Sequence, residues 1–213
     1  MQTRISFQDK AVWTFAVLIL SLTRPAIAQD GPQAGDQGSG EDSRVLSAYE
    51  GTPLPVVEKM LELAQLRPNE VVYDLGSGDG RVLIMAAQKF GARGVGIELD
   101  PHYVEESEAR IWDLGLADRI QLVHGDVLDQ DLSLADVITI YMTPYALWKL
   151  RPHLEKFLHQ GMRIVTVVDQ VPGWKPAATV TAQGDNQRSY SLSLYVITRP
   201  GQWTSFSKFG RTQ

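Results

Sequence analysis

Residues 71–80 read Val71-Val72-Tyr73-Asp74-Leu75-Gly76-Ser77-Gly78-Asp79-Gly80, which predicts a buried strand that stops abruptly at a cluster of glycines. The next residues, Arg81 to Phe90, have apolar side chains at helical spacing, and Gly91 stands where a helix C-cap is expected. A second apolar run, Val95 to Glu98, predicts a strand that ends in an acid. Strand, glycine turn, helix, strand and terminal acid, in that order, are typical of the first half of a nucleotide-binding α/β fold.

The glycines predict a loop that binds a ligand. They allow positive φ angles and let a ligand approach the backbone without a Cβ in the way. Glu98 lies about 18 residues beyond Gly80, where a carboxylate can accept both hydroxyls of a ribose. The spacing is G-x-G-x-G, because Arg81 occupies the position of the third glycine in the dinucleotide fingerprint G-x-G-x-x-G. A tight turn in an unrelated α/β domain is the alternative interpretation.

With Asp74 ahead of the glycines, the motif D-x-G-x-G-x-G resembles motif I of the class I S-adenosylmethionine (SAM)-dependent methyltransferases. This resemblance implies that the glycine loop passes the methionine part of SAM and that Glu98 holds the ribose. Asp126, just past a predicted strand over Arg119–His124, matches the family position that accepts a hydrogen bond from the adenine amino group, although it could instead cap a turn. The predicted cofactor-binding residues are therefore Asp74, Gly76, Ser77, Gly78, Gly80, Glu98 and Asp126.

A fourth predicted strand, Ala135–Ile140, ends in Tyr141-Met142-Thr143-Pro144-Tyr145. Ligands of open parallel sheets bind beyond such strand ends, so we expect the methyl acceptor here. The stretch departs from the Asn/Asp-Pro-Pro-aromatic motif of many amine-directed methyltransferases. It is similar to a lysine methyltransferase group that includes the ATP-synthase c-subunit lysine methyltransferases and bacterial and archaeal relatives. That group also shows sequences like Asp74–Arg81 and Gly96–Pro101, and the resemblance covers roughly residues 49–176.

By this resemblance the chain is expected to be a SAM-dependent methyltransferase that modifies a protein lysine, although a small-molecule acceptor stays open. A lysine amine must arrive neutral, and an aromatic slot would depress its pKa. We predict that Tyr141 and the backbone near Pro144 orient the amine, while aromatic side chains wall the slot and favour a cationic product. Asp169 could draw the amine in or simply cap a loop. The predicted catalytic residues are Tyr141 and Pro144, and the predicted substrate contacts are Thr143, Tyr145, Asp169 and Trp174.

The whole pattern predicts an α/β fold, a Rossmann-like doubly wound sheet of seven strands, mostly parallel with a C-terminal antiparallel strand pair. That pair is indicated by alternation over residues 189–197 and by a turn at Gly184-Asp185-Asn186, after a strand over 177–182. Nicotinamide domains more often continue parallel, so the pair and Arg81 disfavour a nicotinamide-dependent oxidoreductase. The remaining predicted elements are helices over Pro53–Leu66, Pro101 to about Leu114 and Leu147–Leu158, and a strand over Met162–Val168.

Residues 1–28 predict a signal peptide, with a positive start, about a dozen apolar residues and the cleavage motif Ala26-Ile27-Ala28. The apolar run is short for a membrane span, so none is expected after processing, and an uncleaved anchor is the alternative. In either case the positive-inside rule predicts export to the periplasm or extracellular space. Residues 29–44 predict a disordered linker, and residues 45–213 the methyltransferase domain.

Composition limits the possible functions. The chain has 213 residues and a net charge of −5, which does not indicate nucleic acid as a partner. It has no cysteine and four histidines away from ligand spacing, so we predict no metal site. SAM is a cytosolic cofactor, so export of the chain conflicts with its use. The alternative interpretation is therefore an exported, non-catalytic nucleoside- or protein-binding module. The acids at positions 74 and 98 disfavour that alternative.

Overall fold

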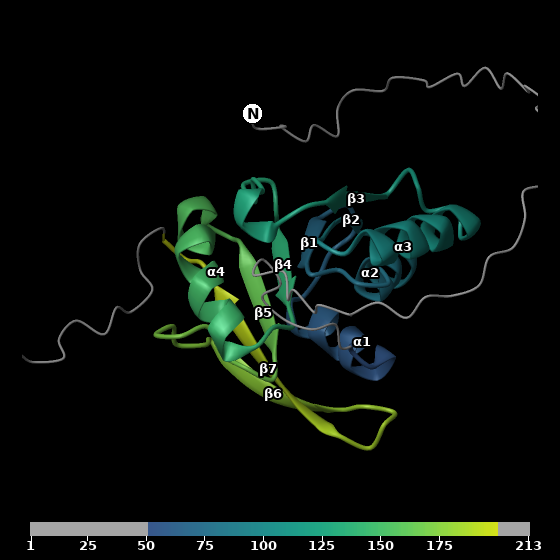
Figure 1. Cartoon of the computed structure of the whole chain (residues 1–213). Coiled ribbons are helices and arrows are strands. Elements are labelled where there is room, and N and C mark those ends of the chain that lie inside the picture. The colour runs from purple at the N-terminus through teal and green to yellow at the C-terminus, as the bar shows by residue number, and fades with distance from the viewer. Residues whose placement is uncertain (1–50, 200–213) are drawn as a thin grey trace, which may run out of the picture. The chain divides into compact units, whose positions relative to one another are not determined.

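The computed structural model describes residues 51–199, so the predicted signal peptide and linker lie outside the described residues. The strands are β1 Val71–Leu75, β2 Arg93–Glu98, β3 Ile120–His124, β4 Val137–Ile140, β5 Arg163–Val167, β6 Ala178–Gln183 and β7 Ser189–Val196. They form one sheet in the order β3-β2-β1-β4-β5-β7-β6 (Figure 1). Strands β1 to β5 pair in parallel, whereas β7 runs antiparallel to β5 and β6. The predicted fold class is therefore confirmed.

Helices cover the sheet on both faces. They are α1 Leu54–Leu63, α2 Arg81–Phe90, α3 Pro101–Asp113, the one-turn 3-10 helix η1 Val127–Asp129, and α4 Pro144–Phe157. The β1–α2–β2 and β2–α3–β3 connections step one way across the sheet, and β4–α4–β5 steps the other way. Right-handed connections therefore place α2 and α3 on one face and α4 on the opposite face. The core between α1, α2 and the sheet includes Val56, Met60, Leu61, Leu83, Val72, Val137, Val165 and Leu192.

Helix α4 begins at Pro144, three residues before the predicted start at Leu147, so that boundary was wrong. The hydroxyl of Thr143 caps the helix by accepting a 3.3 Å hydrogen bond from the Ala146 N–H. Proline is well suited to the first helical position, because its φ is already helical and its missing N–H would have no partner there. Pro144 and Tyr145 therefore belong to the first turn of a helix, and only residues 141–143 form the loop after β4.

Gly96 in β2 is a close-packed position with no room for a side chain. A Cβ there would lie 2.6 Å from both Leu122 Cδ2 and Ser77 Oγ, and 2.8 Å from Leu83 Cδ1. We expect Gly96→Ala to lower the free energy of unfolding by about 1–3 kcal/mol, because overpacking displaces these neighbours. Urea denaturation would measure the change, and unaltered stability would contradict this packing. Gly125→Ala is the matched control, since its new Cβ would meet only the flexible end of a glutamine at 3.1 Å.

Candidate functional site

The loop after β1 exposes backbone at the edge of the sheet where the parallel strands end. Gly76, Gly78 and Gly80 have φ angles of +78°, +51° and +74°, which only glycine adopts without strain. The N–H of Gly76 donates to the Ile97 carbonyl at 2.9 Å, and the N–H of Gly78 donates to the Glu98 carboxylate at 2.8 Å. The loop is thus fixed to the end of β2, while Gly76 itself stays exposed.

Glu98, at the end of β2, is held by three backbone N–H groups. Oε2 accepts from Gly78 at 2.8 Å, and Oε1 accepts from Leu99 at 2.8 Å and from Asp100 at 2.9 Å. A carboxylate offers about four lone-pair positions, so these bonds leave acceptor capacity on Oε2. The partly buried carboxylate is therefore oriented before any ligand arrives, with room to accept from a hydroxyl.

Asp74, at the end of β1, is a buried acid next to the glycine loop. Burial raises its pKa to about 7; a hydrogen bond from Thr139 opposes the rise, and the charges of Glu98 and Asp79 add to it. The bond from Thr139 Oγ1 to Asp74 Oδ1 is 2.6 Å long. Thr139 lies in β4 and is fully buried. The sequence did not single out Thr139, because only the pairing of β1 with β4 brings it beside Asp74.

Two further predicted cofactor residues make local contacts. The Ser77 side chain is turned toward β2, where its buried Oγ lies against Gly96 and has no hydrogen-bond partner among residues 51–199. Asp126 caps η1, with Oδ1 accepting a 2.9 Å bond from the Leu128 N–H. The turn-capping alternative for Asp126 is therefore present in the structure, and contact of either side chain with a cofactor stays a prediction.

Arg81 joins the glycine loop to the segment before α1, a role that sequence reasoning missed. Its guanidinium binds Asp79 through two bonds of 2.7 and 2.8 Å, and Nη1 donates to the Thr52 carbonyl at 3.0 Å. Arg110 adds a contact to Asp79 at 3.2 Å. Burial alone would raise the pKa of Asp79, but the hydrogen bonds and charge of Arg81, with Arg110, bring it below its usual value. The only sequence signal was an arginine in place of a third glycine.

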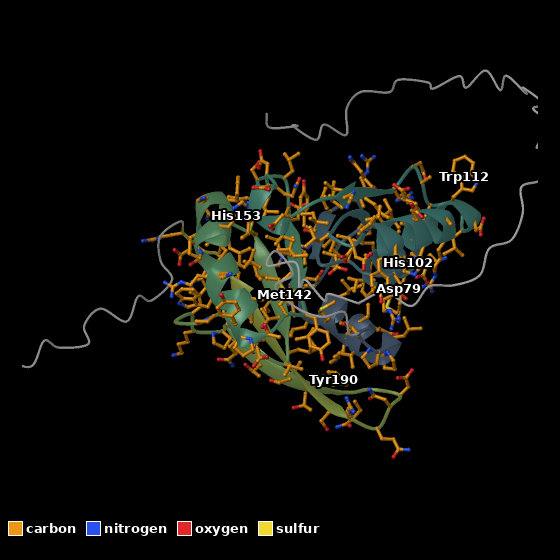
Figure 2. The ribbon with its side chains drawn as sticks, in the orientation of Figure 1. Asp79, His102, Trp112, Met142, His153 and Tyr190 are labelled. Carbon is orange, nitrogen blue, oxygen red and sulfur yellow. The ribbon has the colours of Figure 1, made fainter. Side chains whose placement is uncertain are left out.

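The loop after β4 lies against the glycine loop. Met142, labelled in Figure 2, is buried. Its Cε is 3.5 Å from the position that a Cβ on Gly76 would take. Tyr141, the preceding residue, is partly buried, and its ring meets the ring of Tyr190 edge-on at a centroid distance of 6.5 Å. The structure thus brings Tyr141 into the neighbourhood of the loop, and Met142 and Tyr190 join it although the sequence had not marked them as site residues.

The other predicted substrate residues lie in different surroundings. Tyr145 is 58% exposed; its ring stacks on exposed Trp148 and has Lys149 Nζ 4.7 Å from its centroid. Trp174 is buried, donates from Nε1 to Glu155 at 3.3 Å, and meets Tyr195 edge-on. These are the contacts of a packing residue, and a role for Trp174 as a wall of the acceptor slot stays a prediction.

Asp169 follows a tight turn at the end of β5. Its N–H donates to the Val167 carbonyl at 2.9 Å, and Val168 between them has a φ of +67°. This geometry is that of a γ-turn, which is rare and strained for a β-branched residue. The turn places Asp169 at the same edge of the sheet as Tyr141, since both follow parallel strands at their carboxyl ends.

These features fit SAM, which carries a ribose, an ammonium and a sulfonium. Glu98 has acceptor capacity for a hydroxyl, and ionised Asp74 would attract a cation beside the loop. The exposed backbone of Gly76 has no Cβ to block approach. Within residues 51–199, no cluster of three or more His, Cys, Asp or Glu could hold a metal ion. No helix in that same range is long and apolar enough to cross a membrane.

Comparisons with known proteins identify the family. The family model described as the ANTKMT methyltransferase domain matches residues 74–178. A protein-lysine N-methyltransferase of Saccharolobus islandicus is 36% identical over 150 residues, which cover 70% of this chain and 92% of that protein. The human ATP-synthase c-subunit lysine N-methyltransferase is 31% identical over 140 residues, covering 65% of this chain and 59% of the relative.

A solved structure agrees with this assignment. The crystal structure of an RNA methyltransferase from Salinibacter ruber, in complex with S-adenosyl-L-homocysteine, is 39% identical in sequence. It superimposes with a TM-score of 0.66 and covers 72% of this chain and 99% of that chain. The chain therefore belongs to the family of the ANTKMT methyltransferase domain and is a SAM-dependent methyltransferase.

Proposed function

We propose that this chain transfers the methyl group of SAM to the side-chain amine of a protein lysine. The observation that carries the proposal is the contact between the two loops, in which Met142 after β4 lies against Gly76 of the glycine loop. An acceptor at Tyr141 would then meet the cofactor at the edge of the sheet. The names of the Saccharolobus islandicus and human relatives support lysine as the acceptor.

The main task of the protein in methyl transfer is to align the acceptor nitrogen with the methyl group of SAM. SAM supplies a methyl group already activated by its sulfonium, so the chain must hold the acceptor nitrogen in line with it. The nitrogen reacts through its lone pair and must therefore be neutral. The partly buried ring of Tyr141 and the buried ring of Tyr190 disfavour an ammonium, because removal from water raises the cost of the charge. In this proposal the Tyr141 hydroxyl orients the amine by a hydrogen bond.

Tyr141→Phe is expected to lower turnover roughly tenfold while the dissociation constant for SAM stays within about twofold. The change removes one hydrogen bond to the acceptor and leaves the glycine loop intact. Transfer of labelled methyl groups measures turnover, and calorimetry measures SAM binding. Tyr103→Phe removes the same atom from α3 and serves as the control. Equal losses of turnover and SAM affinity would contradict the role assigned to Tyr141.

RNA is the second candidate acceptor, because the Salinibacter ruber protein is described as an RNA methyltransferase. The net charge of −5 argues against it, since RNA-binding proteins neutralise phosphates with excess lysine and arginine. Labelled SAM, offered with a lysine-rich protein, with total RNA and with a small-molecule extract, separates the cases. Label that protease releases from the macromolecular fraction supports lysine as the acceptor. Label that only ribonuclease releases supports RNA instead, and label that passes through a filter supports a small-molecule acceptor.

Export remains part of the proposal and is supported by the sequence of residues 1–28 alone. In that case the acceptors are proteins of the cell envelope, or membrane-associated proteins if the segment is an uncleaved anchor. Binding of SAM without transfer to any acceptor would instead favour the non-catalytic module.

A further inference from the structure

We propose that Tyr190 of β7 is a positioning residue that fixes the ring of Tyr141 at the acceptor site. The inference rests on the proposed function, because it concerns the residue assigned to the acceptor there. Tyr190 lies beyond residues 74–178, the part of the chain that the family model matches. This side of the acceptor site is thus supplied by the C-terminal hairpin, outside the segment that defines the family.

The antiparallel course of β7 brings Tyr190 to the site. Leu192 pairs with Val167, the last residue of β5, and the Ser191 carbonyl accepts a 2.7 Å bond from the Val168 N–H. Tyr190 is the next residue, so it lies at the edge of the sheet where the parallel strands end. Figure 2 shows it on the β6–β7 hairpin.

The two rings make a defined contact. Their planes are 83° apart and their centroids 6.5 Å, the edge-to-face arrangement that aromatic pairs prefer. Tyr190 is 4% exposed, so its own ring has little freedom. Its hydroxyl accepts a 2.7 Å hydrogen bond from Asn186 Nδ2, and the Asn186 Oδ1 accepts from the Arg188 N–H at 3.1 Å. The turn between β6 and β7 thereby fixes the ring against which Tyr141 packs.

The turn between β6 and β7 also packs against the segment before α1, which Arg81 joins to the glycine loop. A Cβ on Gly184 would lie 3.0 Å from Tyr190 Cε2 and 3.0 Å from Pro53 Cγ. The neighbouring Thr52 carbonyl accepts a bond from Arg81, which is bonded to the glycine loop through Asp79. Tyr190 is therefore linked to the glycine loop through this series of contacts, and in the proposal its contact with Tyr141 sets where the acceptor lies relative to the cofactor.

Alignment matters because of the step itself. The amine lone pair forms the new N–C bond as the C–S bond breaks, the electron pair of that bond returns to sulfur, and the added positive charge leaves nitrogen as a proton to water. A Tyr141 ring that is free to tilt would meet the in-line geometry less often. The expected consequence of losing Tyr190 is a lower kcat and an altered ratio of mono-, di- and trimethylated product, with SAM affinity unchanged.

Tyr190→Leu in the full chain, assayed with labelled SAM and a histone mixture as lysine-rich acceptor, tests this. We expect kcat to fall at least about fivefold, with the SAM dissociation constant within about twofold. Tyr190→Phe keeps the ring and is expected to retain most of the activity. Tyr195→Leu is the matched control, the same change at a buried tyrosine of the same strand that contacts Trp174 instead. Parallel losses of kcat and SAM affinity in Tyr190→Leu would overturn the proposal.

A second measurement separates this proposal from the proposed function. With 3-fluorotyrosine at position 141, the fluorine resonance is expected to shift in Tyr190→Leu and to stay unchanged in Tyr195→Leu. An unmoved resonance in Tyr190→Leu overturns the positioning role whatever the acceptor is. Wild-type chain that binds SAM yet transfers nothing to lysine would overturn the proposed function, and the fluorine result would still decide the role of Tyr190. If Tyr190→Leu does not fold, Tyr190→Met, which also removes the ring but whose longer, flexible side chain fills more of its space, takes its place with the same two outcomes.

Discussion

Glu98→Ala is expected to abolish SAM binding, with an affinity at least about a hundredfold below that of the wild type. Hydrogen bonds to a charged group contribute about 1.5–3 kcal/mol each, and a ribose would make them with this carboxylate. The same carboxylate accepts the Gly78 N–H, so its removal also releases the glycine loop from the end of β2. Loss of a ligand contact and loss of loop order act in the same direction, which is why this effect should exceed that of any acceptor-side change.

Calorimetric titration with SAM and with S-adenosylhomocysteine measures the effect of Glu98→Ala. Glu98→Gln keeps the shape and one acceptor oxygen, so its affinity should lie between those of the wild type and the alanine variant. Glu105→Ala, at an exposed position of α3, is the control for removing a negative charge nearby. Undiminished binding by Glu98→Ala would show that the ribose lies elsewhere.

The elements around the glycine loop could be predicted because local chemistry sets their limits. Strand β1 and helix α2 have the predicted bounds, since glycines at positive φ separate one from the other and Gly91 ends the helix. The start of α4 could not be predicted from the same kind of signal. A proline after a strand is compatible with a loop or with a helix start, and only the Thr143 cap decides between them.

The site was predictable where a motif is contiguous in sequence and not where the fold assembles it. Glu98 follows the glycines by a characteristic spacing, so it could be assigned to the cofactor loop. Thr139 is 65 residues from Asp74 in sequence, and their hydrogen bond depends on the pairing of β1 with β4. Tyr190 reaches Tyr141 only because β7 inserts between β5 and β6. Periodicity predicts that these strands exist, but it carries no information on strand order.

Asp74 is expected to make SAM affinity fall as the pH drops through about 7, by about tenfold for each further pH unit. Burial raises the pKa of this carboxyl to about 7 in the free protein, and only the ionised form attracts the cationic cofactor. Asp74→Asn stays neutral at every pH, so its affinity at pH 8 should be roughly ten- to a hundredfold lower and should lose this pH dependence.

Calorimetry in two buffers of different ionisation enthalpy measures the proton released on binding. The wild type should release about half a proton at pH 7, and Asp74→Asn should release none from this group. Asp118→Asn, an exposed position after α3, is the matched control. If the wild type binds SAM without releasing a proton, and with the same affinity between pH 6 and 8, the role of Asp74 is contradicted.

The stability of the ligand-free protein should change in the opposite sense. The pKa of Asp74 is raised above its ordinary value of 3.8, so between that value and about 7 the unfolded chain is ionised while the folded chain is still protonated. Stability from this group is therefore full below about 4 and falls as the pH rises to about 7. Asp74→Asn removes that loss, so its melting temperature should exceed that of the wild type at pH 8 and approach it near pH 4. A variant that binds SAM more weakly yet melts at a higher temperature cannot owe its weak binding to poor folding. That combination would show that the buried charge of Asp74 serves SAM binding and not the stability of the fold.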